Sequence, residues 1–151
     1  MANQQLPDDF KEFLRLLNEE KIDYLLIGGY AVGYYGYPRT TADMDIWIAA
    51  VPKNAEKIVS VLKQFGMDSP EIKPELFLSI GNIVRMGVPP IRIEILNEID
   101  GVKFDECYKN HKLTEMQGVS VKIISLQDLL KNKKASARYK DLDDIDNLPE
   151  S

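Results

Sequence analysis

Hydrophobic residues along this 151-residue chain recur at two spacings, the three-to-four-residue repeat of an amphipathic helix and the two-residue repeat of a strand. The helical repeat, with prolines and capping residues at its ends, predicts helices over 8–20, 30–37, 52–64 and 137–148, a helical turn within 102–108 and a helix that begins at Ser125. Alternation and short apolar runs predict strands over 24–27, 43–49, 82–86 and 91–96, and a hairpin from 112–116 and 119–124. Because helices and strands interleave along the chain, we expect an α/β (α+β) fold with helices packed on a mixed β-sheet.

Length and composition are those of an ordinary globular protein. A chain of 151 residues buries about two thirds of its unfolded surface in a single core, so we expect one domain spanning 1–151. No apolar run approaches the roughly 20 residues that span a bilayer, and the N-terminal residues lack the basic and apolar regions of a secretion signal. Cys107 is the single cysteine, so no intrachain disulfide can form. We therefore expect a cytoplasmic protein with no membrane partner.

The formal charge of −5 limits the classes of partner. A broad surface that clamps nucleic acid needs clustered Lys and Arg, which this balance disfavours, while a small basic pocket for phosphates is compatible with it. One His and one Cys cannot supply the ligands of a zinc finger.

Two aspartates follow a glycine pair in the first third of the chain. The strand 24–27 runs into Gly28-Gly29, and the strand 43–49 carries Asp43 and Asp45 at positions i and i+2. Successive strand side chains point to opposite faces, so the two carboxylates share one face, about 6–7 Å apart along the strand, while the apolar residues between them face the core. Two oxygen donors beside a glycine turn favour a magnesium site against a polyphosphate. Solvated acids at a strand edge, or capping of a turn, are the alternative.

Gly28-Gly29, a gap of thirteen residues and the run Asp43-Met44-Asp45-Ile46 together resemble the signature of the DNA polymerase β-like nucleotidyltransferase superfamily. The resemblance implies a palm-like core, a nucleoside triphosphate substrate, and Asp43 and Asp45 as catalytic residues that hold Mg²⁺ or Mn²⁺. In the superfamily a later strand supplies a third acidic residue.

Glu94 is the residue that this resemblance assigns as the third metal ligand and catalytic carboxylate. It lies in the alternating strand 91–96, on the face opposite the isoleucines. This chain has Glu where Asp is usual in the superfamily. A surface charge pair between Arg92 and Glu94, worth under about 1 kcal/mol, is the alternative.

Several residues near the glycine pair are candidates for binding the nucleotide. Gly28 and Gly29 form a turn that lets phosphates approach the backbone closely. Arg39 and Thr41 could contact phosphate or brace the loop, and Tyr30 could stack on a base or pack in the core.

The run from Leu126 to Asp144 resembles the closing segment of the AbiEii-type abortive-infection nucleotidyltransferases, at Leu126, Leu129, Lys134, Arg138, Asp141, Leu142 and Asp144. The resemblance implies that Lys134, with Arg138 or Lys140, reaches toward the triphosphate or the acceptor. Lys131, Lys134 and Arg138 share one face if the helix continues. Cations near a helix C-terminus are the ordinary alternative.

The leading hypothesis is transfer of a nucleoside monophosphate from a nucleoside triphosphate to an acceptor hydroxyl. The acceptor could be transfer RNA, a protein or a small molecule, and the resemblance allows a toxin of a toxin–antitoxin or phage-defence system with an antitoxin partner. The competing hypothesis is a catalytically inactive module of the same fold that serves as a regulator or antitoxin.

Overall fold

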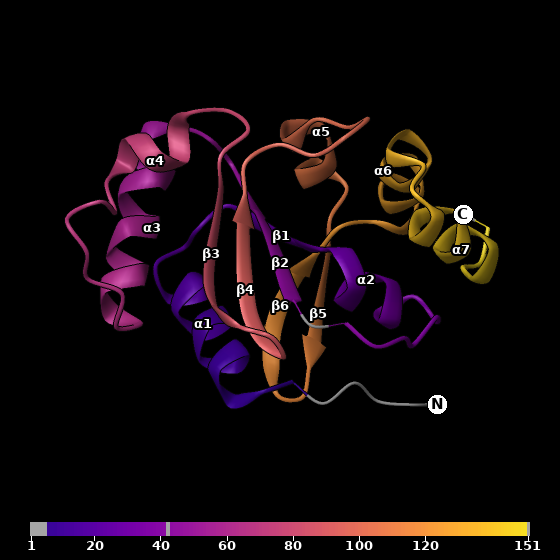
Figure 1. Cartoon of the computed structure of the whole chain (residues 1–151), viewed down its shortest axis with the longest axis horizontal. Coiled ribbons are helices and arrows are strands. Elements are labelled where there is room, and N and C mark those ends of the chain that lie inside the picture. Colours follow the sequence, from indigo (N-terminus) through magenta and orange to yellow (C-terminus); the bar gives the residue numbers. More distant parts are fainter. Residues whose placement is uncertain (1–5, 42, 151) are drawn as a thin grey trace.

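A central β-sheet with helices on both sides organises the chain, as a computed structural model shows (Figure 1). The structure describes residues 6–41 and 43–150, so residues 1–5, on which the expectation about a secretion signal rests, lie outside it. The strands are β1 (Tyr24–Ile27), β2 (Asp43–Ile48), β3 (Ile83–Val88), β4 (Ile91–Leu96), β5 (Lys112–Met116) and β6 (Val119–Ile123).

The sheet is mixed, as the sequence predicts. Its strand order is β3-β4-β2-β1-β6-β5. The pairs β1–β2, β3–β4 and β5–β6 are antiparallel, whereas β1–β6 and β2–β4 are parallel. The parallel β2–β4 pair is the one that matters for the site, because it joins strands that are far apart in the sequence.

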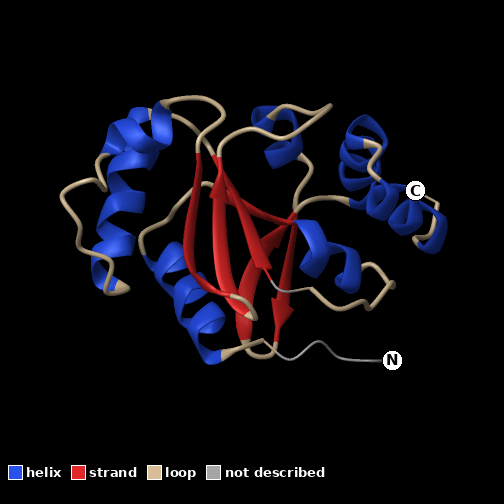
Figure 2. Cartoon of the chain, in the orientation of Figure 1, coloured by secondary structure: helices blue, strands red, loops and turns tan. Residues whose placement is uncertain are grey.

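Helices cover both faces of the sheet (Figure 2). They are α1 (Asp8–Glu19), α2 (Gly28–Tyr34), α3 (Pro52–Gln64), α4 (Pro74–Leu78), α5 (Phe104–Lys109), α6 (Leu126–Ser136) and α7 (Tyr139–Asn147). In Figure 1, α1, α3 and α4 lie on the left of the sheet, α5 lies above it, and α2, α6 and α7 lie on the right. None of the helices in the described ranges is both long and apolar enough to span a membrane.

The core lies between the sheet and the α1–α3 layer. The apolar face of β2 (Met44, Ile46 and Ile48) is fully buried, and so is the stripe of α1 at helical spacing: Phe10, Phe13, Leu14 and Leu17. Each such side chain contributes about 1.5–3 kcal/mol on burial. This burial fixes the opposite face of β2, with Asp43 and Asp45, toward the side that carries α6 and α7.

Capping residues mark the beginning of α6 and the end of α3, as the sequence predicts. The Ser125 hydroxyl accepts a hydrogen bond from the Asp128 backbone N–H at 3.2 Å, which caps α6, and Gly66 follows α3 with a left-handed φ of +102°.

Two expectations about helix bounds are corrected. The helix after the glycine pair is Gly28–Tyr34 rather than 30–37, because the helix starts within the turn itself.

The second correction concerns the C-terminal helices. Helix α6 ends at Ser136 because Ala137 adopts a left-handed φ of +51°, and α7 begins only at Tyr139. The helix therefore does not continue through Arg138, and Arg138 does not share a helical face with Lys131 and Lys134. Instead the chain turns and α7 packs against α6.

Candidate active site

The register of β2 and β4 brings the predicted acids together. Asp45 lies directly opposite Glu94, and Asp43 lies opposite Arg92. Asp43, Asp45 and Glu94 are half-buried, and each offers a carboxylate oxygen within 4.8 Å of the others. The acids that the resemblance assigns as a set therefore occupy one site on the sheet.

Two arginines neutralise two of these carboxylates. Arg92 donates from Nε and Nη2 to the two oxygens of Asp43, both at 2.9 Å, and its Nη2 lies 3.7 Å from Glu94 Oε2. Arg85 of β3 donates to the same Glu94 oxygen at 2.9 Å. Paired, charge-assisted contacts of this kind are the stronger class of hydrogen bond.

Asp45 is in a different situation. Its Oδ1 is buried and has no hydrogen-bond partner among the described residues. Burial, reinforced by the neighbouring charges of Glu94 and Asp43, raises the pKa of Asp45 to about 7, and the positive charges of Lys140 and Lys133 offset this in part. A carboxylate with an unsatisfied buried oxygen beside two like charges is a place where a cation relieves repulsion.

The donor set fits a divalent metal ion. Mg²⁺ takes oxygen ligands at about 2.1 Å, so adjacent ligand oxygens are separated by about 3 Å and opposite ones by about 4 Å. The carboxylate oxygens here lie within 4.8 Å of one another, so small side-chain adjustments bring them to such a geometry. Asp43, Asp45 and Glu94 are therefore suited to hold a divalent metal ion.

The glycine pair is required by its contacts with this site. Gly28 has a φ of +70°, and a Cβ added there would collide with Asp45 Oδ2. A Cβ on Gly29 would lie 2.5 Å from Thr41 Oγ1, and Thr41 in turn donates a hydrogen bond to the backbone carbonyl of Asp43 at 3.2 Å. Glycine is the residue that tolerates both the conformation and the close approach. The turn and the aspartate strand are thus packed directly against each other.

A cleft of about 510 Å³ opens over this face of the sheet. The sheet and the glycine turn form one wall, and residues of α6 and α7 form part of the other. The residues predicted from the sequence that line it are Gly28, Gly29, Arg39, Thr41, Asp43, Asp45, Glu94, Arg138 and Lys140.

Two predicted nucleotide-binding residues lie elsewhere. The Tyr30 side chain is buried and packs edge-on against Phe10, with ring centroids 5.7 Å apart. Lys134 is exposed, and the neighbouring Lys133 lines the cleft in its place. The structure therefore gives the Tyr30 and Lys134 side chains no contact with the cleft.

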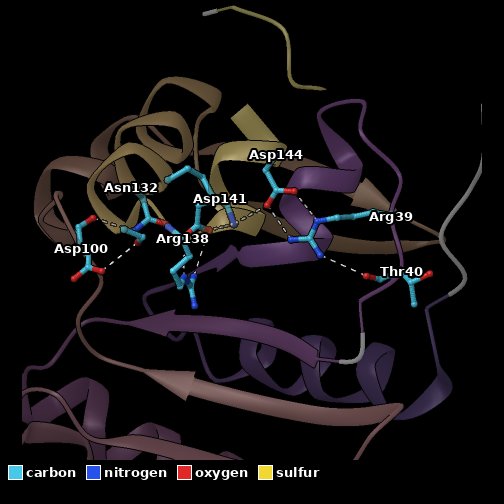
Figure 3. A network of polar contacts seen from close by, with 9 residues as sticks. Arg39, Thr40, Asp100, Asn132, Arg138, Asp141 and Asp144 are labelled. Carbon is cyan, nitrogen blue, oxygen red and sulfur yellow. Dashed lines mark hydrogen bonds and ion pairs between the residues drawn. The ribbon is translucent and has the colours of Figure 1, made fainter. Parts of the chain in front are cut away.

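A buried ionic network forms the α6–α7 wall (Figure 3). The Lys133 ammonium lies 3.2 Å from Asp141 Oδ1 and 3.1 Å from Asp144 Oδ2, and both carboxylates are fully buried. Arg39 donates from Nε and Nη2 to the two oxygens of Asp144 at 2.7 and 2.9 Å. The network therefore ties the loop that precedes β2 to both C-terminal helices.

Asp141 also holds Arg138 at the start of α7. It accepts hydrogen bonds from the Arg138 backbone N–H at 3.2 Å and from Nε at 2.7 Å. Burial alone would raise the pKa of Asp141, but the hydrogen bonds from Arg138 and Lys133 outweigh it and lower the pKa below its ordinary value. Arg138 is thereby held at the edge of the cleft.

Lys133 is a site residue that sequence reasoning missed, although a signal for it exists. It follows Leu129 and Leu130 by four and three residues, so it lies on the apolar stripe of α6. A lysine on a buried stripe needs carboxylate partners, and the acidic α7 supplies them. The contacts of Arg85 with Glu94 and of Arg92 with Asp43 were missed, because only the strand pairing shows which side chains are neighbours. The charge pair between Arg92 and Glu94, which the sequence offers as an alternative, is present as a longer contact of 3.7 Å.

The chain has a mixed sheet in which acidic residues of two neighbouring strands lie beside a turn of two glycines. This is a nucleotidyltransferase-like fold. Over residues 7–151 the chain matches the family described as "Nucleotidyl transferase of unknown function (DUF2204)", and it belongs to that family. A crystal structure of a "putative nucleotidyltransferase (TM1012)" from Thermotoga maritima is similar, with a TM-score of 0.55, 15% identity, and 90% of this chain and 85% of that chain covered. At that identity the likeness concerns the fold.

No curated protein matches this chain. The family and the structural likeness confirm the nucleotidyltransferase resemblance that the sequence motif suggested. The finer likeness to AbiEii proteins stays a prediction.

Proposed function

We propose that this protein transfers a nucleoside monophosphate from a nucleoside triphosphate to an acceptor hydroxyl, with Mg²⁺ or Mn²⁺ as cofactor. The observation that carries the proposal is the convergence of Asp43, Asp45 and Glu94, whose carboxylate oxygens lie within 4.8 Å of one another beside the glycine turn. Membership of a nucleotidyl transferase family supports the same substrate class.

The residues divide into those that hold the metal and those that receive the phosphates. Asp43, Asp45 and Glu94 would hold the metal ion, which when bound supplies positive charge that offsets the charge of the triphosphate. The Gly28–Gly29 turn presents backbone with no side chain in the way, so phosphate oxygens can approach it. Among the described residues that line the cleft, the cations are Arg39, Arg85, Lys133, Arg138 and Lys140.

The reaction itself is a displacement at the α-phosphorus. The acceptor oxygen forms a bond to that phosphorus, the bond to the bridging oxygen of the β-phosphate breaks, and pyrophosphate leaves. The acceptor's proton passes to a carboxylate, and Glu94 is the candidate base, since it lies at the edge of the acidic set toward β3. Arg138 and Lys140, at the cleft, balance charge on the departing pyrophosphate.

The acceptor classes to screen are transfer RNA, proteins and small hydroxylated molecules. A toxin role with an antitoxin partner is the biological form of the proposal in which the acceptor is transfer RNA or protein. The inactive-module hypothesis requires a damaged acid set, and the complete set of three carboxylates disfavours it.

The test is incorporation of label from each of the four α-³²P nucleoside triphosphates, with Mg²⁺ or Mn²⁺, into a panel of these acceptors and into the protein itself. We expect label transfer with at least one pair, and loss of at least about 100-fold for the double variant Asp43→Asn, Asp45→Asn, because both carboxylates are needed to hold the metal.

The matched control is the double variant Asp68→Asn, Asp146→Asn, which removes the same charge from two exposed positions. It should retain the activity of the unaltered protein. Activity that survives in the Asp43, Asp45 variant would contradict the proposal. So would the absence of label transfer together with the absence of any heat of binding for all four metal–nucleotide complexes in calorimetry.

A further inference from the structure

We propose that Arg92 is a built-in competitor of the metal ion. In the metal-free protein its guanidinium group binds the carboxylates of Asp43 and Glu94. It thereby keeps the affinity of the site for a divalent cation low until a nucleotide brings further negative charge. The inference rests on the proposed function, since it concerns the same three carboxylates, and it concerns an arginine that the motif does not contain.

The geometry places Arg92 between the ligands. Because β2 and β4 pair in parallel, Arg92 lies directly opposite Asp43 on the polar face of the sheet. Both oxygens of Asp43 accept hydrogen bonds from Arg92 at 2.9 Å, and the same Nη2 that contacts Asp43 lies 3.7 Å from Glu94. One guanidinium group therefore bridges two of the three carboxylates that would hold the metal.

The strand pairing leaves Arg92 little freedom to move aside. It is fixed on the same face as Glu94, two residues away on β4, and its side chain is 30% exposed. Arg85, which holds Glu94 from the edge strand β3, is 53% exposed and contacts a single carboxylate among the described residues. Arg85 can swing into solvent at small cost, whereas Arg92 has to give up contacts with two carboxylates.

Like charges in one site weaken each other's binding. A cation held by Asp43 and Glu94 competes with a second cation for the same oxygens and repels it through a partly dry medium. A triphosphate carries enough negative charge for both cations, so the metal is expected to bind well only together with a nucleotide. If Arg92 merely oriented Asp43 as a ligand, its removal would have the opposite effect and weaken metal binding.

The experiment measures Mn²⁺ binding without nucleotide, from the electron paramagnetic resonance signal of free Mn²⁺. A positive charge within about 4–6 Å lowers the proton affinity of a carboxylate by about one to three powers of ten, and its effect on a bound metal cation has the same sign. We therefore expect Arg92→Gln to bind Mn²⁺ about ten-fold or more tightly than the unaltered protein. Arg92→Lys, which keeps the charge but loses the fork of two donors, should fall between the two. Arg85→Gln should tighten binding less than Arg92→Gln.

Arg15→Gln is the matched control, because it removes one positive charge from the exposed side of α1, the helix that packs on the opposite face of the sheet. It should leave the Mn²⁺ affinity unchanged. Far-UV circular dichroism and urea unfolding of each variant establish that it is folded, and Arg92→Lys carries the test if Arg92→Gln is not.

Unchanged or weaker Mn²⁺ binding by the Arg92 variants would overturn the inference. Equilibrium dialysis of the unaltered protein with Mn²⁺ and labelled nucleoside triphosphates then shows whether the inference about Arg92 fails alone or the proposed function fails with it. Binding of the labelled nucleotide with Mn²⁺ would leave the proposed function standing while the role of Arg92 fails. No binding of any nucleotide would overturn both.

Discussion

Asp45 differs from the other two carboxylates of the site because its Oδ1 has no hydrogen-bond partner among the described residues. Asp43 and Glu94 are held by arginines, whereas Asp45 has a buried, unpartnered oxygen and lies against Gly28. The protein therefore keeps an acidic group in an unfavourable environment at the place where the metal is expected. Sites of this kind sacrifice stability for function.

This environment predicts a pH dependence of stability. The ordinary pKa of Asp45 is 3.8, and burial beside Glu94 and Asp43 raises it to about 7 in the folded protein. Between these values the folded state holds a proton that the unfolded state has released, so the free energy of unfolding falls as the pH rises from about 4 to about 7. The loss that Asp45 causes is roughly 2–4 kcal/mol.

Asp45→Asn should remove this loss. In metal-free buffer at pH 8 we expect the variant to be roughly 2–4 kcal/mol more stable than the unaltered protein, while at pH 4 the two should be nearly equal. Urea unfolding across this pH range measures the difference, and Asp146→Asn, at an exposed position, is the control. Parallel curves for Asp45→Asn and the unaltered protein would contradict the prediction.

At the scale of elements, helices α6 and α7 form a unit that is held by charge as well as by packing. Lys133 is 4% exposed and shared between Asp141 and Asp144, both of which are fully buried. A buried carboxylate that loses a cationic partner is strongly destabilising. The same carboxylates hold Arg138 and Arg39 at the cleft, so this unit also shapes the wall of the site.

Lys133→Met tests this role, because it keeps an unbranched side chain and removes the ammonium group. We expect it to lower the free energy of unfolding by about 3 kcal/mol. Lys134→Met, at the exposed neighbouring position, is the matched control and should change stability by less than about 0.5 kcal/mol. Urea unfolding measures both. Equal effects of the two substitutions would show that the Lys133 network contributes little.

At the scale of the whole molecule, the six strands of the described chain form one sheet with a continuous hydrophobic core. One domain over 1–151 stays a prediction. Trp47, the single tryptophan of the chain, is buried in β2 and packs edge-on against Phe104 of α5 at a centroid distance of 5.1 Å. Its fluorescence therefore reports on the central part of the sheet.

A single domain should unfold in one cooperative transition. We expect the urea midpoints from Trp47 fluorescence and from far-UV circular dichroism, which reports mainly on the helices, to coincide within experimental error. The calorimetric and van't Hoff enthalpies of thermal unfolding should also agree. Separate midpoints for the two signals would contradict the single-domain expectation and indicate that the C-terminal helices unfold independently.

The nucleotidyltransferase motif and most elements could be predicted because they are local features. The positions of α1, β1, α3 and β4 follow from repeats of 3.6 or 2 residues and from prolines at helix ends, and the shared face of Asp43 and Asp45 follows from the pleat of one strand. The bounds were predicted least well around the strand expected over 82–86, because this segment has no clear repeat; the structure has α4 at Pro74–Leu78 and β3 at Ile83–Val88.

The sequence by itself determined the acid pair, the glycine turn and the buried face of β2, since each depends on neighbours a few residues away. Only the tertiary structure decided that β4 pairs with β2 in a register that places Glu94 opposite Asp45 and Arg92 opposite Asp43. It also decided that Lys133, rather than Lys134, lines the cleft. The physical reason is that strand register and helix orientation are fixed by packing between segments far apart in the chain, which no local pattern encodes.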